Sequence, residues 1–191
     1  ADLDKDFGME KNHKSSVKGM LEYVLDKKTP YSFIDAGCGN GWVVRSVERN
    51  FLCKEAMGVD GSKKMVDKAK KLDPSGSYVC ADLMSWLPHK KVDIVHSMEV
   101  FYYLENPKKV IQQIFDLWLK KNGRLILGID FYFENKISHN WPDSCGISKM
   151  KLFSEKKWVS FFNTAGFHSI KAWRIGKLKD WPGTLVICGI K

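Results

Sequence analysis

The sequence lacks a long hydrophobic run, paired cysteines and an arginine-rich segment, and each absence disfavours a class of protein. No apolar stretch approaches the ~20 residues that a transmembrane helix requires, so we predict no membrane association. Residues 1–30 mix charged and apolar side chains throughout, which disfavours a signal peptide. Internal repeats and low-complexity segments are also absent. What remains is a globular protein, and a length of 191 residues fits a single domain.

The five cysteines do not form a disulfide or zinc pattern. They are odd in number and widely spaced, and none belongs to a C-x-x-C motif or a cysteine–histidine pair at zinc spacing. No metal site is therefore expected. Reduced thiols are typical of the cytosol, so the cysteine pattern predicts a cytoplasmic protein.

The net charge of +9 raises the question of a nucleic-acid partner. The excess is nearly all lysine, and the lysines are scattered along the chain. Base and phosphate recognition favours the planar fork of arginine, whereas dispersed lysine is typical of a solvated surface. A nucleic-acid partner stays open but is not favoured. The sequence does not indicate an oligomeric state.

Strand-like and helix-like segments alternate along the chain, which predicts an α/β fold with a doubly wound, mostly parallel sheet. The predicted strands are 31–36, 56–60, 78–81, 92–96, 124–130, 169–175 and 184–190. The predicted helices are about 42–50, one that Ser62 caps, one from Asn106-Pro107 to Asn122-Gly123, and one from Ser154 to Gly166. Ligands of such sheets bind beyond the carboxyl ends of the strands, where the strand order reverses.

A glycine-rich loop between the first strand and its helix is the central motif, with the sequence Asp35-Ala36-Gly37-Cys38-Gly39-Asn40-Gly41. Glycine there permits positive φ and a close approach of a ligand to the backbone. The dinucleotide fingerprint is G-x-G-x-x-G, but here the spacing is G-x-G-x-G and Trp42 takes the sixth position. Asp35 beside the loop suits an ammonium or sulfonium better than a pyrophosphate. A nicotinamide-dependent oxidoreductase is therefore disfavoured.

Two further carboxylates close the second and third predicted strands. Asp60 suits hydrogen bonds from both hydroxyls of a ribose, although it could instead cap the following helix. Asp82 suits the amino edge of an adenine, although a surface turn would also explain it. Both lie at strand ends on the side of the glycine loop, which favours the ligand role.

The ordered set D-A-G-C-G-N-G, G-V-D-G-S, A-D-L and V-D-I-V-H-S-M-E-V-F-Y-Y-L resembles class I methyltransferases of the small-molecule (type 11) group over residues 32–130. The resemblance implies a Rossmann-like, seven-stranded sheet whose last strand is antiparallel and lies beside the fifth. It also implies S-adenosyl-L-methionine as the methyl donor and S-adenosyl-L-homocysteine as the product. The cofactor-binding residues that it implies are Asp35, Gly37, Cys38, Gly39, Asn40 and Gly41 for the methionine part, Asp60 with Gly61 and Ser62 for the ribose, Asp82 and Leu83 for the adenine, and Ser97, Met98 and Glu99 after the fourth strand.

The acceptor side is less defined, because methyl transfer from a sulfonium mainly requires alignment and exclusion of water. A base is needed only where the acceptor must lose a proton, so the sequence identifies no catalytic residue beyond the candidates His139 and Glu134. The side chains expected to face the acceptor are His96, Tyr102, Tyr103, Asp130, Tyr132, Glu134, His139 and Trp141. Of these we predict substrate binding by Tyr102, Tyr103, Tyr132, His139 and Trp141, with packing or solvent exposure as the alternative for each.

Two segments are expected to cover the acceptor. Residues 131–152 are too long and too aromatic for an ordinary connection, so we predict an acceptor-side cap. Residues 1–30 are predicted to form a helical lid, with apolar side chains at Val17, Met20, Leu21, Val24 and Leu25.

We predict methyl transfer to a small-molecule acceptor within one domain, residues 1–191. An RNA or protein methyltransferase is an alternative, as is a non-catalytic S-adenosylmethionine-binding module. The proline-rich motif common in methyltransferases of nucleic-acid bases is missing after the fourth strand, where His96-Ser97-Met98-Glu99 stands.

Overall fold

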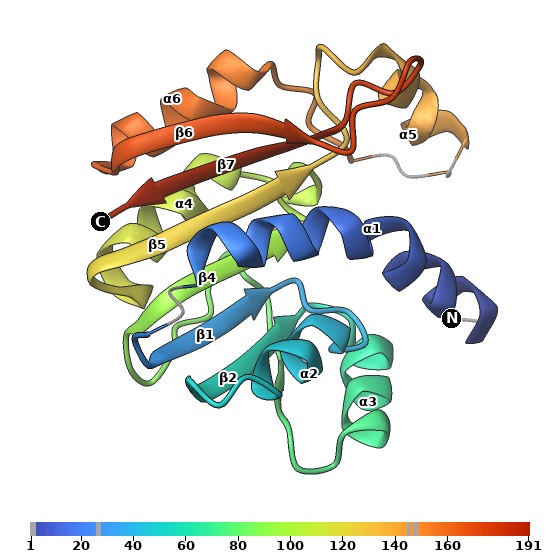
Figure 1. The fold of residues 1–191 in the computed structure, drawn as a ribbon. Coiled ribbons are helices and arrows are strands. Elements are labelled where there is room, and N and C mark those ends of the chain that lie inside the picture. The colour runs from blue at the N-terminus through green and yellow to red at the C-terminus, as the bar shows by residue number, and fades with distance from the viewer. Residues whose placement is uncertain (1–2, 26–27, 145, 147–148) are drawn as a thin grey trace.

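The computed structural model describes residues 3–25, 28–144, 146 and 149–191, which form an α/β fold with helices on both faces of one sheet (Figure 1). The strands are β1 Tyr31–Ala36, β2 Cys53–Asp60, β3 Ser77–Cys80, β4 Val92–Met98, β5 Leu119–Ile129, β6 His168–Ile175 and β7 Thr184–Ile190. The helices are α1 Leu3–Val24, α2 Trp42–Glu48, α3 Lys63–Leu72, α4 Pro107–Gln113, α5 Trp141–Ser144 and α6 Glu155–Ala165. Shorter helical segments are η1 Phe101–Tyr103, η2 Ile114–Trp118 and η3 Lys136–Asn140. Within the described residues, no helix has both the length and the apolar character that crossing a membrane demands.

The seven strands lie in the order β3-β2-β1-β4-β5-β7-β6. Strands β1 to β5 pair in parallel, and β7 runs antiparallel to both of its neighbours, β5 and β6. The Rossmann-like sheet with an antiparallel last strand is therefore confirmed. The strand order reverses between β1 and β4, so the carboxyl ends of these two strands open the crevice where ligands bind in such sheets.

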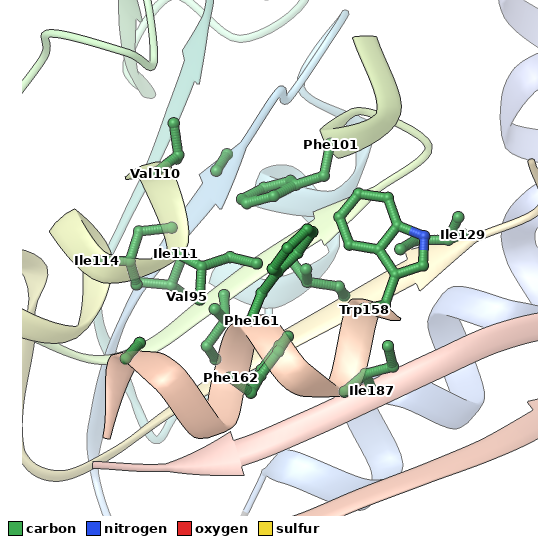
Figure 2. Close-up of a cluster of buried hydrophobic side chains, with 14 of the residues drawn as sticks. Val95, Phe101, Val110, Ile111, Ile114, Ile129, Trp158, Phe161, Phe162 and Ile187 are labelled. Atoms are coloured by element: carbon green, nitrogen blue, oxygen red, sulfur yellow. The ribbon is translucent and has the colours of Figure 1, made fainter. Parts of the chain in front are cut away.

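Two apolar layers hold the helices on the sheet. On one face, α4 and α6 contribute Ile111, Trp158 and Phe162, all fully buried (Figure 2). Trp118 of η2, also fully buried, belongs to the same cluster. On the other face, α1, α2 and α3 pack a second cluster against the sheet. Because both faces are covered, all six residues of β1 are buried, as expected for a central parallel strand.

The helix predicted from Asn106 to Asn122 was correct at its start and wrong at its end. Asn106 Oδ1 accepts a hydrogen bond from Lys109 N at 3.0 Å, and the helix continues only through the wider turn of η2. Strand β5 then begins at Leu119, which is fully buried and pairs with Val92. The burial of Leu119 in the sheet outweighs the helical pattern of the sequence. The register between β4 and β5 shifts between Val92 and Ile94, which accommodates Asn122 at φ 64°. The predicted caps at Ser62 and Ser154 are confirmed.

Helix α1 covers residues 3–24 of the predicted lid, 1–30, while residues 1–2 and 26–27 lie outside the described residues. Val17, Met20 and Val24 are buried against the sheet, and Ser16 Oγ lies 2.8 Å from the Thr184 hydroxyl on β7. The second half of α1 is therefore part of the core. Its first half extends past the carboxyl ends of β1 and β5 (Figure 1).

The predicted cap, residues 131–152, follows β5 and contains η3 and α5, while residues 145, 147 and 148 lie outside the described residues. Its beginning belongs to the core, since Phe131 and Tyr132 are buried. Asn135 is also buried, and its side-chain amide donates to Asp130 O at 2.7 Å. Removing the whole segment would therefore disrupt packing as well as any acceptor contact.

Candidate functional site

A pocket of about 300 Å³ lies at the carboxyl ends of the central strands. This volume is at the lower end of the roughly 300–1,000 Å³ of small-molecule sites. Residues of the predicted site that line it are Asp35, Gly37, Cys38, Gly39, Asn40, Asp60, Met98, Glu99 and Tyr103. Residues that the sequence did not single out are His13, Trp42, Val43, Met65 and Val100.

The glycine loop turns sharply between β1 and α2. Its three glycines have φ values of 83°, 52° and 77°, in the left-handed region that favours glycine. The amides of Gly37 and Cys38 both donate to the carbonyl of Val59, at 2.7 and 3.1 Å. A Cβ on Gly37 would lie 2.2 Å from Val100 Cγ2, so no side chain fits there. The absence of a side chain at Gly37 thus lets Val100 pack directly against the loop.

A buried hydrogen bond orients Asp35 at the edge of this loop. Its Oδ1 lies 2.7 Å from His96 Nδ1, and both side chains are almost completely buried. The His96 ring stacks on Phe33, with ring centroids 5.9 Å apart, and Nε2 has no partner among the described residues. His96 was expected to face the acceptor. It is instead completely buried, where it pairs with Asp35.

Asp60 joins the loop to the following helix. Its Oδ2 accepts from Gly39 N at 2.9 Å and its Oδ1 accepts from Ser62 N at 2.8 Å. Asp60 therefore braces the residue before α3, where Ser62 is the cap, and also lines the pocket; its role toward a ribose stays a prediction. Each carboxylate oxygen can accept more than one hydrogen bond, so bracing the loop leaves capacity for a ligand.

Several predicted cofactor residues lie beside the pocket rather than on its wall. Asp82 is exposed and accepts from Met84 N at 2.9 Å, while Leu83 is buried in the core. Ser97 is buried, and its hydroxyl donates to Ala36 O at 2.5 Å. Gly41, Gly61 and Ser62 are also absent from the lining. The roles of these residues stay predictions.

The predicted acceptor residues are not gathered at one place. Tyr102 is buried and donates to Glu99 Oε2 at 2.7 Å, which places it behind the wall of the pocket. Tyr132 is fully buried, and its hydroxyl donates to Gly183 O at 2.8 Å and accepts from Arg174 Nε at 3.0 Å. Of the predicted acceptor residues, Tyr103 alone lines the pocket, with 41% of its surface exposed.

Three further acceptor candidates, His139, Glu134 and Trp141, contact residues of the cap and its surroundings. His139 Nε2 lies 2.9 Å from Phe133 O. Glu134 accepts from Glu155 N at 3.0 Å and so stabilises the start of α6, where a carboxylate also interacts favourably with the helix dipole. Trp141 stacks on Phe131 and on Trp181, with centroids 6.5 and 6.4 Å apart. These contacts give His139 and Glu134 structural roles that do not require catalysis.

A group of buried acids that the sequence did not connect lies at the ends of β4 and β5. Glu99, at φ 61°, accepts from the Tyr102 hydroxyl through Oε2 and from Asp130 N through Oε1. Burial raises the pKa of Glu99 well above its usual range, and the charge of Asp130 raises it further. Asp130 is 5% exposed, and its Oδ2 lies 3.7 Å from His13 Nδ1 on α1. No sequence motif links a helix near the start of the chain to the end of β5.

Replacing Glu99 with Gln should flatten the pH dependence of stability. A raised pKa means that the folded state holds a proton on Glu99 that the unfolded state releases, so this group lowers stability as pH rises above about 4.3. Glu99→Gln cannot ionise and keeps the shape of the side chain. Urea unfolding at pH 5 and pH 8 should show a smaller loss for Glu99→Gln than for the native protein. Glu105→Gln, at an exposed position, is the matched control; an unchanged loss in Glu99→Gln would mean that Glu99 is ionised in the folded protein.

A larger groove of about 730 Å³ lies between α1 and α2 and shares Trp42 with the pocket. Helix side chains line most of it, among them Lys14, Lys18, Arg45 and Arg49. The glycine loop and the carboxylates at the strand ends are not in its lining. The smaller pocket therefore remains the candidate functional site.

Comparison with known proteins finds relatives that are named as methyltransferases. Residues 34–127 match the family model described as a methyltransferase domain. The chain is similar to malonyl-[acyl-carrier protein] O-methyltransferase of Halalkalibacterium halodurans, with 30% identity over 118 residues that cover 56% of this chain and 43% of the relative. It is also similar to trans-aconitate 2-methyltransferase of Rhizobium rhizogenes, with 31% identity over 94 residues, 49% of this chain and 36% of the relative. The chain thus spans less than half the length of either relative.

A solved structure resembles the chain over nearly its whole length. It is a complex between the Haloferax volcanii Trm112 methyltransferase activator and a protein assigned as a methyltransferase. The similarity has a TM-score of 0.86 at 26% identity and covers 98% of this chain and 94% of the other.

Proposed function

We propose, from the premise that this chain belongs to the class I S-adenosylmethionine-dependent methyltransferases, that it methylates a small-molecule acceptor. The observation that carries the proposal is the pocket at the reversal of strand order, where the glycine loop, Asp35 and Asp60 meet. The names of the two curated relatives specify a malonyl group and trans-aconitate, which favours a small organic acceptor.

The residues of the pocket fit the methyl donor. Gly37 has no side chain, so Val100 packs directly against the loop and both line the wall of the pocket. Asp35, held through one oxygen by His96, offers a carboxylate to the ammonium of the methionine part. Asp60 offers a carboxylate to the ribose hydroxyls. When bound, the donor supplies a methyl group already activated on a sulfonium.

The chain itself would hold the reactants and exclude water, which is the main requirement of this in-line displacement. Met98, Val100 and Trp42 supply apolar wall to the pocket, and α1 brings His13 to its edge. Tyr103 is half exposed and lines the same pocket, so it marks the side from which we expect an acceptor to enter.

Isothermal titration calorimetry with S-adenosylmethionine tests the donor site. Saturable binding is expected, and S-adenosylhomocysteine should bind as well. The donor at 100 times its Kd should stabilise the fold by about 2.7 kcal/mol, measurable by urea unfolding. NADH is the control ligand and should not bind. Absence of S-adenosylmethionine binding at millimolar concentration would refute the proposal, and an acceptor screen that detects released S-adenosylhomocysteine addresses the acceptor.

The similarity to the methyltransferase of the Trm112 complex supports a second proposal, that this chain binds an activator of the Trm112 type. Size-exclusion chromatography of the chain mixed with Haloferax volcanii Trm112 should show a joint peak if the binding surface is retained. An acceptor on RNA or protein would fit the charge of +9, and binding to polyanions would then weaken steeply with salt.

The free thiols at Cys38, Cys53, Cys80 and Cys188 agree with the predicted cytoplasmic location.

A further inference from the structure

A histidine and an aspartate that are far apart in the chain meet at the pocket. His13 lies on the first half of α1, lines the pocket and keeps 25% of its side chain exposed. Its Nδ1 lies 3.7 Å from Oδ2 of Asp130, which follows the carboxyl end of β5. The other Asp130 oxygen, Oδ1, is buried without a hydrogen-bond partner among the described residues.

At 3.7 Å, Asp130 lies within ion-pair distance of His13 Nδ1, so its charge acts on the ring from that side. An aspartate beside Nδ1 favours the tautomer with a proton on that nitrogen, which leaves the lone pair of Nε2 free to take a proton. Burial lowers the pKa of His13, an effect that the charge of Asp130 partly opposes, so the ring is neutral near pH 7. A neutral imidazole with one oriented nitrogen is the form that a base requires.

The other acids of the pocket are less able to take a proton from an acceptor. Both oxygens of Glu99 already accept hydrogen bonds from the protein, and burial keeps its pKa high. Asp60 accepts backbone hydrogen bonds through both oxygens. Asp35 is paired with His96. His13 is the histidine of the pocket lining, and its ring is partly exposed.

The charges that face the pocket also select the acceptor. The carboxylates of Asp35 and Asp60 line it together with Glu99, whose raised pKa keeps it protonated, and with His13 and the phenol of Tyr103. Lysine and arginine are absent from the described lining. An acceptor carboxylate would meet no permanent cation there and would approach acidic groups. A hydroxyl or amino group avoids this repulsion, and an amine gains from it.

We propose that His13, positioned by Asp130, is the catalytic base for an acceptor whose nucleophilic oxygen or nitrogen carries a proton. This inference rests on the proposed methyltransferase function. The lone pair of the acceptor atom forms the new bond to the methyl carbon, and the sulfur–methyl bond breaks with its electron pair staying on sulfur. The proton of the acceptor passes to Nε2 of His13, and Asp130 stabilises the resulting imidazolium until solvent takes the proton.

Turnover of defined acceptors by the whole chain tests the substrate class. One panel contains phenols and primary amines, such as catechol and tyramine, and the other contains malonate and trans-aconitate. S-adenosylhomocysteine should form with members of the first panel. Turnover confined to the acids, or turnover of neither panel by a protein that binds S-adenosylmethionine, would overturn the substrate class. Failure to bind the donor would instead refute the proposed function.

Variants at the pair test the base. His13→Gln should lower kcat about 100-fold or more, as expected for loss of a general base, while the Kd for S-adenosylmethionine stays within a few-fold. The rise of kcat with pH below neutrality should disappear in His13→Gln. In Asp130→Asn this rise should move to lower pH, because the carboxylate no longer favours the imidazolium. His168→Gln, at an exposed position, is the matched control and should keep the native profile.

A measurement without turnover completes the test. Nitrogen-15 NMR of the imidazole rings, with the His13 signal assigned by its loss in His13→Gln, should show a proton on Nδ1 at pH 7. Its pKa should lie below 6.5 and should fall further in Asp130→Asn. Retention of kcat and of the pH profile by His13→Gln would overturn the proposal, as would a proton fixed on Nε2 at pH 7.

Discussion

Gly37→Ala should be the most damaging single change at the pocket. The residue has φ 83°, a left-handed backbone that costs an L-residue roughly 1–2 kcal/mol. The new methyl group would also lie 2.2 Å from Val100 Cγ2, and inserting a methyl into a packed site costs typically about 1–3 kcal/mol. Urea unfolding should therefore show a free energy of unfolding lower by about 2–5 kcal/mol. Calorimetry should show at least about tenfold weaker S-adenosylmethionine binding, because the loop must move to accept the methyl group.

Gly176→Ala separates the two contributions. Gly176 has a similar φ of 70°, but a Cβ there would meet nothing within 4 Å. Its substitution should cost only the roughly 1–2 kcal/mol of the backbone and leave donor binding unchanged. In a double variant, Val100→Ala should recover part of the stability lost in Gly37→Ala, since the two sites are in contact. Equal losses at Gly37 and Gly176 would show that the contact with Val100 is unimportant.

Asp60→Ala should weaken S-adenosylmethionine binding about 10- to 100-fold. A hydrogen bond to a charged group contributes about 1.5–3 kcal/mol, and each 1.4 kcal/mol is a factor of about ten. The variant would lose the carboxylate for the ribose and the brace on Gly39 N and Ser62 N. Calorimetry gives the Kd, and urea unfolding measures the loss of the brace.

Asp93→Ala is the matched control for Asp60. Asp93 also accepts a backbone hydrogen bond, from Ser32 N at 2.8 Å, but it lies near the amino end of β4, away from the pocket. Its loss should lower stability and leave donor affinity unchanged. Asp60→Ala could instead behave like Asp93→Ala, with reduced stability and unchanged affinity. In that case Asp60 only braces the loop, and the ribose assignment is wrong.

The amino-acid sequence by itself determined the architecture and the position of the glycine loop and acids that we propose for the donor. Alternating apolar segments with capped helices predicted the parallel sheet, because these signals act over a few residues and do not depend on distant partners. The loop from Gly37 to Gly41 and the acids Asp35 and Asp60 could also be found, since each follows directly from a strand. Parallel strands bring their carboxyl ends to one edge, so these residues had to be neighbours.

Only the tertiary structure decided which of the residues expected at the acceptor side reach the pocket. Tyr132 and Glu134 carry suitable groups, but Tyr132 packs beneath Arg174 and Glu134 stabilises the start of α6. His13 and Asp130 are far apart in the chain and meet because α1 packs across the sheet to the end of β5. A local pattern can predict a strand or a loop. It cannot predict which of several polar side chains the packing of distant elements will bury and which it will turn toward a pocket.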